Sequence, residues 1–155
     1  MRIKSLNIFL ILIIFFCTHL LYAQDMKAPD FALKDINDKT FALSDFKGKN
    51  VILFFWAIQC PYCIDEMKKM LSRCSELISE DLRILAINVG DSKKRLDNFF
   101  KSKSICFDVL LDSRASVAYI YDLAGVPAFF IIDKDGFLRY SGYRMPRKLD
   151  EYLKK

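Results

Sequence analysis

The 155-residue sequence has a single histidine, His19, and a single Cys-x-x-Cys motif, which runs from Cys60 to Cys63. Zinc is normally held by four cysteine or histidine ligands. Because neither a second Cys-x-x-Cys motif nor another histidine is present, the sequence argues against a zinc site, and we expect no metal and no other cofactor. Neither sign of charge dominates: the formal net charge is +5, and basic residues lie among acids, as at Lys34 and Asp35. Such a balance indicates solvated surface and gives little support to nucleic-acid binding.

A long membrane-spanning run is missing as well. The apolar run that begins at Ile8 and ends at Cys17 has ten residues, whereas a transmembrane helix needs about 20. Two basic residues precede this run, and Ala23 follows it. This is the layout of a secretory signal peptide. We therefore expect cleavage after residue 23 and one exported domain over residues 24–155, in the periplasm or the cell envelope.

Two alternatives stay open for this segment. If it is not cleaved, residues 6–22 would form a membrane tether. Cys17 would carry a lipid in a lipoprotein, but Phe15 and Phe16 precede it, where lipoprotein signals usually have small residues. Cleavage is favoured because the apolar run is short. It would remove two basic residues and no acid, so the formal net charge would fall from +5 to +3.

Apolar patterning predicts strands that alternate with helices. Residues 51–56 include no polar side chain, as expected of a strand covered on both faces. Asp135-Gly136 is a typical hairpin turn. The order predicts an α/β domain in which a mixed β-sheet begins with an N-terminal β-hairpin and carries helices on both faces. Strands are expected at 31–33, 40–43, 51–56, 83–89, 107–111, 128–132 and 137–140, and helices at 61–78, 93–102, 113–121 and 147–153, with one helical turn at 44–48.

The Cys-x-x-Cys motif lies between the buried strand and a helix. Cys60 is expected at the helix N-cap and Pro61 at the first helical position, where a missing N–H costs nothing. Unpaired N–H groups and the helix dipole then favour the thiolate of Cys60, which is the species that attacks disulfides. Cys63 should be more buried and would resolve a mixed disulfide, leaving a Cys60–Cys63 disulfide. A structural staple is a weaker interpretation, because closing a two-residue loop gains little.

Four segments, in this order along the chain, carry a family resemblance. They are Ala28-Pro29-Asp30-Phe31, Leu43-Ser44-Asp45-Phe46-Lys47-Gly48-Lys49, Phe55-Trp56-Ala57 with Cys60-Pro61-Tyr62-Cys63, and Gly125-Val126-Pro127-Ala128-Phe129-Phe130-Ile131-Ile132-Asp133. Together they resemble the TlpA/ResA group of exported thiol–disulfide oxidoreductases. The resemblance extends over residues 27–153. It implies a thioredoxin-like three-layer α/β/α sandwich, in which residues 83–112 resemble the insertion that separates this group from minimal thioredoxins.

The resemblance also implies roles for single residues. It implies a cis bond before Pro127, so that the Val126 backbone faces a substrate strand beside the sulfurs. An ordinary trans proline at a strand start is the alternative. Glu66 resembles the active-site glutamate of the ResA branch, which is thought to tune proton transfer at the cysteines. Its alternative is a solvated acid on the helix.

Trp56, Pro61 and Tyr62 complete the expected substrate-binding residues. Trp56 is expected to pack under the active-site loop, and this packing alone is enough to explain why a tryptophan stands there. Tyr62 is expected to be exposed between the cysteines. Two features depart from relatives of this group. Phe54 stands six residues before Cys60, where thioredoxin has a buried Asp, and Pro-Tyr is more typical of glutaredoxins. The reduction potential therefore cannot be carried over from either family.

Cys74 and Cys106 are harder to interpret. Cys74 comes eleven residues after Cys63, which on one helix separates them by about 16 Å, too far for a direct bond. In an oxidising compartment Cys74 and Cys106 can form a bridge. Two buried free thiols are an equal alternative, because cysteine often serves as a small core residue.

The function expected from these features is an exported reductant of protein disulfides. The resemblance implies envelope clients, such as apoproteins in cytochrome c maturation, and an upstream membrane thiol reductase as electron donor. We expect a monomer. A disulfide-forming oxidant of DsbA type and a non-catalytic thioredoxin-like binding module are the alternatives. A copper carrier would want a histidine ligand and a wider cysteine spacing, but the expected mature domain 24–155 has no histidine. A peroxidase would want a threonine shortly before its reactive cysteine, and no threonine lies shortly before Cys60.

Overall fold

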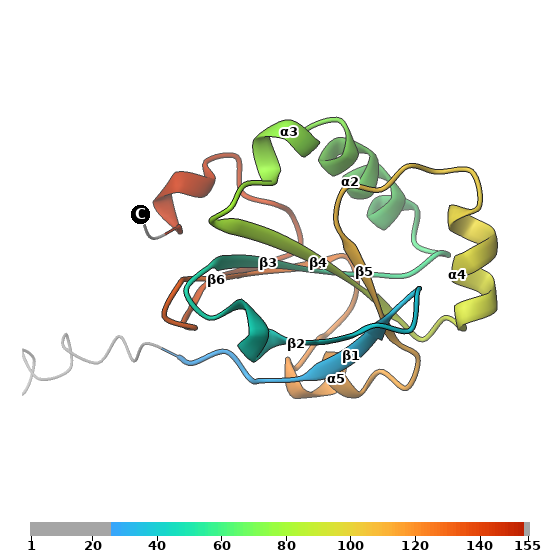
Figure 1. Ribbon diagram of the computed structural model, residues 1–155, viewed down its shortest axis with the longest axis horizontal. Coiled ribbons are helices and arrows are strands. Elements are labelled where there is room, and N and C mark those ends of the chain that lie inside the picture. Colours follow the sequence, from blue (N-terminus) through green and yellow to red (C-terminus); the bar gives the residue numbers. More distant parts are fainter. Residues whose placement is uncertain (1–25, 154–155) are drawn as a thin grey trace, which may run out of the picture.

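The computed structural model describes residues 26–153 (Figure 1). The expected signal segment 1–23 and the alternative tether 6–22 lie outside the described residues. At the centre of the domain, strand β3 (Asn50–Trp56) lies parallel to β4 (Leu82–Val89). All seven residues of β3 are buried, because the sheet is covered on both faces. The fully apolar run thus forms the expected central strand.

The sheet has seven strands in the order β2-β1-β5-β4-β3-β6-β7. The pairs β3–β4 and β4–β5 are parallel, and the other neighbours are antiparallel. The expected mixed sheet with an N-terminal hairpin is therefore confirmed. The remaining strands are β1 (Ala32–Asp35), β2 (Thr40–Ala42), β5 (Asp108–Asp112), β6 (Ala128–Ile132) and β7 (Leu138–Gly142).

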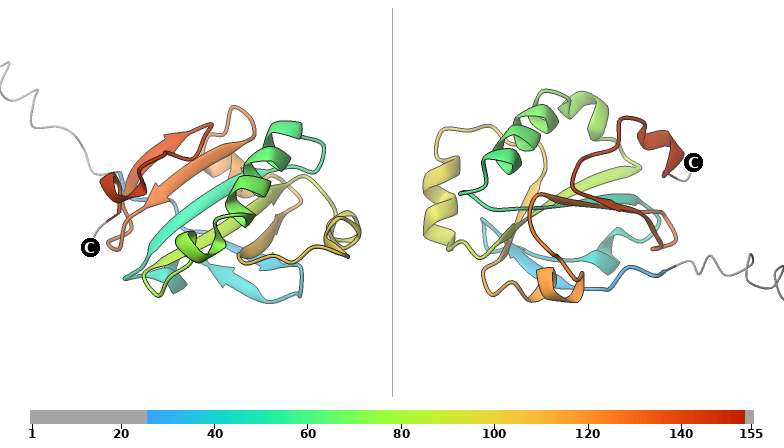
Figure 2. Two further views of the ribbon diagram at one scale, coloured as in Figure 1. Left: turned by 90° about the horizontal axis from the view of Figure 1, so that it is seen from above. Right: turned by 180° about the vertical axis from the view of Figure 1, so that it is seen from behind.

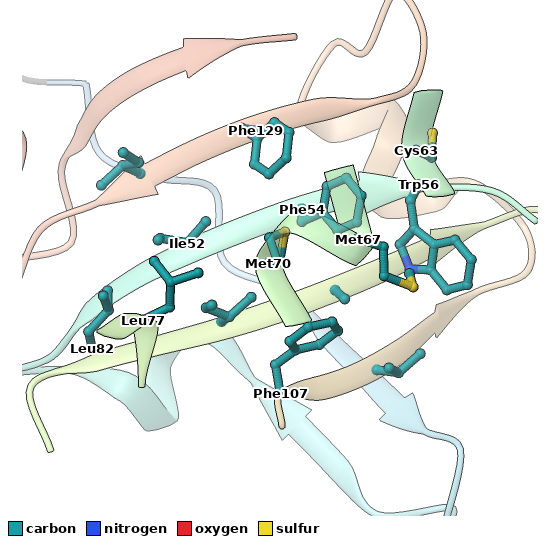
Figure 3. Packing of buried hydrophobic residues seen from close by; sticks show 14 of the residues in the cluster. Ile52, Phe54, Trp56, Cys63, Met67, Met70, Leu77, Leu82, Phe107 and Phe129 are labelled. Carbon is teal, nitrogen blue, oxygen red and sulfur yellow. The ribbon is translucent and has the colours of Figure 1, made fainter. Parts of the chain in front are cut away.

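Helices cover both faces of this sheet, which gives three layers (Figures 1 and 2). On one face, Ile52, Phe54 and Trp56 of β3 pack against Met67 and Met70 (Figure 3). The helices on that face are α2 (Pro61–Leu71), α3 (Cys74–Leu77) and α4 (Lys93–Phe100). The alternate side chains of β3 point to the other face, where the 3-10 turn η1 (Leu43–Phe46) and α5 (Ser116–Ile120) cover them.

The long helix expected over 61–78 is wrong in one respect, because it is interrupted. Helix α2 ends at Leu71, and α3 begins only at Cys74. The Ser72 hydroxyl donates to the Lys69 carbonyl oxygen at 2.9 Å, so it competes for a backbone acceptor at the helix end. Arg73 leaves helical geometry with φ −118° and ψ 21°.

The C-terminal helix expected over 147–153 is also wrong. The structure has only a 3-10 turn, η2 (Leu149–Glu151). A segment this short forms a stable helix only when it packs extensively, and η2 has no buried residue. The other element ends differ from expectation by a few residues, where end fraying and packing decide the boundary. Within residues 26–153, no helix is both long and apolar enough to cross a membrane.

Candidate active site

The cysteine pair lies where β3 ends and α2 begins. Cys60 is the N-cap of α2 with an extended backbone, and Pro61 occupies the first turn. The Cys63 amide N–H donates to Cys60 Sγ at 3.1 Å, so the sulfur takes one of the donors that a helix start leaves unpaired. After reduction the same donor and the helix dipole would stabilise a negative charge on this sulfur.

Cys60 and Cys63 form a disulfide with Cα atoms 5.2 Å apart. The side chain of Cys63, in the first turn of α2, is fully buried, whereas Cys60 is only partly buried. Cys63 belongs to the same buried cluster as Trp56 and Met67, and Figure 3 shows it beside Trp56. An incoming molecule therefore reaches the Cys60 sulfur, and Cys63 lies behind it. The greater burial of Cys63 is as expected from the sequence, and the roles of the two thiols in exchange stay predictions.

The start of β6 supplies the third part of the site. The Val126–Pro127 peptide bond is cis, which is the isomer that the resemblance implies. Cys60 Sγ lies 3.6 Å from the Val126 carbonyl oxygen. Strand β6 pairs with β3 up to Phe55 and Ala128, and this pairing holds the Val126–Pro127 bend against the cysteines. Residues 66 positions apart in the sequence thus meet at one sulfur.

Two aromatic residues near the cysteines, Trp56 and Tyr62, differ in exposure. Trp56 is fully buried, and its ring centroid is 5.6 Å from that of Phe99 and 5.7 Å from that of Phe100. Its burial fits packing under the loop and leaves the indole no surface for a client. Tyr62 is 76% exposed, and Pro61 is exposed beside it. These two residues form the outer rim around Cys60.

Glu66 lies on α2, one helical turn beyond Cys63. Its side chain is 15% exposed, and its carboxylate forms an ion pair with Lys69 at 2.8 Å. The Lys69 ammonium donates a hydrogen bond to this carboxylate. Glu66 and Cys63 lie on the same helix, three residues apart. The role of Glu66 in proton transfer stays a prediction.

Asp91 is a site residue that sequence reasoning missed. Its buried carboxylate accepts hydrogen bonds from the Ile58 amide and from Asn88 Nδ2, each at 3.0 Å, and pairs with Arg95 at 2.6 Å. Ile58 lies in the loop just before Cys60, so the hydrogen bond to the Asp91 carboxylate holds this loop in position. Asn88, a polar residue at the end of an apolar strand, was the available signal. On the sequence alone, Gly90-Asp91-Ser92 predicts only the end of a strand and the cap of the next helix.

The structure joins Cys74 and Cys106 in a second disulfide with Cα atoms 6.1 Å apart. This bond ties α3 to the segment that precedes β5. Of the two alternatives left open by the sequence, the structure has the bridge. A metal centre has no counterpart in residues 26–153, where no cluster of three or more histidine, cysteine or acidic side chains has suitable geometry.

Comparison with known proteins places this geometry in a family. The sequence pattern of the AhpC/TSA family matches residues 25–141. The chain is similar to the thiol-disulfide oxidoreductase ResA of Bacillus subtilis (strain 168), with 40% identity over 114 residues, 74% of this chain and 64% of that protein. It is also similar to ResA of Geobacillus thermodenitrificans (strain NG80-2), with 33% identity over 122 residues, 79% of this chain and 70% of that protein.

Solved structures show the same fold. The crystal structure described as a thiol:disulfide interchange protein DsbE from Chlorobium tepidum has a TM-score of 0.71 and 27% identity, covering 82% of this chain and 89% of the other. The exposed lipoprotein thioredoxin of Streptococcus pneumoniae strain TIGR4 has a TM-score of 0.67 and 27% identity, covering 79% and 93%. The chain thus has a thioredoxin-like fold.

Proposed function

Because the chain belongs to the AhpC/TSA family and, within it, to the ResA thiol–disulfide oxidoreductases, we propose that Cys60 and Cys63 exchange disulfides with client proteins outside the cytosol. One observation carries this proposal. A partly exposed sulfur at a helix start is bonded to a fully buried sulfur one turn away. This pairing separates the thiol that meets a client from the thiol that releases it.

In the reducing direction the cysteine pair supplies both electrons, and the two protons come from Cys63 and from solvent. The Cys60 thiolate attacks one sulfur of a client disulfide, and the other client sulfur leaves as a thiolate that takes up a proton. Cys63 then loses its proton and attacks Cys60 Sγ, which releases the second client thiol. The client gains two electrons and two protons, and the protein is left with the Cys60–Cys63 disulfide.

The client strand is proposed to lie along the Val126–Pro127 bend. The Val126 carbonyl oxygen is 3.6 Å from Cys60 Sγ, so a chain bonded to that sulfur passes beside this backbone. An extended segment can pair with such an edge through main-chain hydrogen bonds. Exposed Tyr62 and Pro61 would border the client on the other side.

We propose that the physiological direction is reduction of envelope proteins, with apocytochromes as one class of client. An upstream membrane thiol reductase would then regenerate the dithiol. The similarity to proteins named ResA supports this direction, and the proposed signal segment 1–23 would deliver the domain to the same compartment as its clients. The oxidising direction uses the same residues and differs only in reduction potential.

Insulin reduction by dithiothreitol tests the activity. The purified protein should accelerate the reaction, Cys60→Ala should abolish the acceleration, and Cys63→Ala should accumulate a mixed disulfide. The Cys74→Ala/Cys106→Ala variant is the matched control and should retain activity. Equal rates with and without Cys60 would reject the proposal. Equilibration with glutathione measures the reduction potential of the Cys60–Cys63 disulfide and so tests the direction. A potential near that of thioredoxin, about −270 mV, indicates a reductant. A potential near that of DsbA, about −120 mV, indicates an oxidant.

A further inference from the structure

A basic cleft lies beside the reactive helix. It has a volume of about 250 Å³ and lies between α2–α3 and the segment 144–147 that follows β7. Four cationic side chains line it, namely Lys69, Arg73, Arg144 and Arg147, against the single carboxylate of Glu66. For a chain whose formal net charge is only +5 over 155 residues, this is a concentrated positive charge.

Two of these cations are available to a ligand. Lys69 pairs with Glu66, and Arg73 pairs with Glu76 at 2.8 Å. Arg144 and Arg147 are exposed, and the structure gives their guanidinium groups no ion-pair partner among residues 26–153. A planar guanidinium group binds a carboxylate through two parallel hydrogen bonds. The cleft is therefore complementary to carboxylates.

The floor of the cleft is apolar. Met70 and Leu77 line it and are almost fully buried, while Met145 and Pro146 line it from the other wall. Such a floor fits the methylene groups of glutamate and neighbouring apolar side chains. A basic rim over an apolar floor matches a polypeptide better than an inorganic anion, because an anion alone would leave the floor unused.

The cleft is within reach of a client held on Cys60. Glu66, at its near end, comes six residues after Cys60, or about 9 Å along the helix axis. Helix α2 ends at Leu71, eleven residues after Cys60 or about 17 Å along the axis, and Arg73 at the far end of the cleft follows it. An extended client advances about 3.3 Å per residue. Side chains about three to six residues from the client cysteine therefore reach the cleft.

We propose that this cleft binds an acidic stretch of the client, three to six residues from the cysteine that reacts with Cys60. The inference rests on the proposed function and adds a preference among clients. Arg144 and Arg147 hold the client carboxylates, and the apolar floor accepts the intervening side chains. The cleft thereby selects clients by charge before the disulfide is exchanged.

Two disulfide-linked peptides that differ only in flanking charge test the proposal. One carries glutamate at positions three to six from its cysteine, and the other carries glutamine there. The reduced protein should react with the acidic peptide faster by about five- to tenfold at low ionic strength, because exposed charge pairs add modestly to association. The ratio should fall toward one in 0.5 M salt, since salt at about that concentration screens exposed charges.

Variants locate the preference. In Arg144→Gln/Arg147→Gln the ratio of the two rates should fall to about one. The conservative variant Arg144→Lys/Arg147→Lys should keep part of the ratio. The matched control is Lys34→Gln/Arg114→Gln, which removes two exposed cations outside the cleft and should leave the ratio unchanged.

The outcomes separate the two proposals. If neither peptide reacts, the proposed function fails. If both react at equal rates, or if the glutamine variant keeps the acidic preference, thiol exchange stands and the cleft proposal is overturned. Sedimentation with anionic lipid vesicles provides a further arm: if the two arginines are needed for vesicle binding and not for peptide preference, the cleft faces a membrane and the proposal is wrong.

Discussion

The backbone N–H of Ile58 donates to the buried carboxylate of Asp91, with nitrogen and oxygen 3.0 Å apart. This bond connects the loop before Cys60 to Asp91, two residues beyond the end of β4, and the two residues are 33 positions apart in the sequence. Arg95 balances the charge from the surface side at 2.6 Å. The position of the reactive sulfur therefore depends on a carboxylate that takes no part in the exchange itself.

We expect Asp91→Ala to destabilise the protein by about 2–4 kcal/mol, because it leaves the Ile58 amide and Asn88 without their buried acceptor. Urea unfolding of the oxidised protein measures this loss. Asp91→Asn keeps an acceptor oxygen and should lose less. Asp97→Ala, at an exposed acid of α4 that pairs with Lys93, is the control and should cost about 0.5 kcal/mol or less. An equal effect of the two alanine variants would contradict the assigned role.

Local patterns predicted much of this fold. The apolar run 51–56 predicts a buried central strand without further information, and strand β3 includes all of it. The local geometry of the cysteine motif could also be predicted from the sequence, because an N-cap residue such as Cys60 followed by a proline starts a helix. Such features depend on neighbours within a few residues, which the sequence shows directly.

Contacts between distant residues could not be predicted in this way. The bond between Asp91 and Ile58 exists only because β3 and β4 lie side by side. The break between α2 and α3 was hidden because the apolar spacing continues through it, while the Ser72 hydroxyl bonds the Lys69 carbonyl. The pairing of Cys74 with Cys106 likewise depends on how that break positions α3.

The Cys74–Cys106 disulfide should stabilise the fold without serving the exchange reaction. It closes a loop with a sequence separation of 32, and loop-closure entropy predicts a loss of about 3–4 kcal/mol when it is removed. Urea unfolding of Cys74→Ala/Cys106→Ala and of the parent protein, both oxidised, measures the difference. Once both proteins are fully reduced, the two curves should approach each other. Unchanged stability in the oxidised state would argue against a structural disulfide.

Asp133 should make stability depend on pH. Burial by itself would raise the pKa of Asp133, but hydrogen bonds from the Phe137 and Asp135 amides and from Arg139 outweigh it and lower the pKa. A pKa that is lower in the folded state contributes stability above the unfolded value, and the contribution disappears as pH falls through the folded value. The stability advantage of the parent protein over Asp133→Asn should therefore shrink below about pH 4. A difference that stays constant from pH 7 to pH 3, measured by urea unfolding, would contradict this linkage.

Glu66 is expected to assist proton transfer at Cys63. Its carboxylate is one turn away on α2 and only 15% exposed, so it can act in a partly dry environment. We expect Glu66→Gln to slow disulfide exchange by about tenfold or more at neutral pH and to change the pH profile of the rate. Glu76→Gln, which removes an exposed acid paired with Arg73, is the matched control. Identical pH profiles for the two variants would assign Glu66 to the ion pair with Lys69 alone.

The difference in burial between the two active-site sulfurs should appear as a difference in reactivity. In the disulfide state Cys63 is fully buried and Cys60 is partly exposed at the helix start. After gentle reduction, iodoacetamide should therefore modify Cys60 first, because alkylation needs an accessible thiolate. Peptide mapping by mass spectrometry at short times counts the label on each cysteine. Cys63→Ala should keep the fast phase and Cys60→Ala should lose it. Fast labelling of Cys63 in the Cys60→Ala variant would show that the buried thiol is open to solvent, and the order of attack and resolution would then have to be reversed.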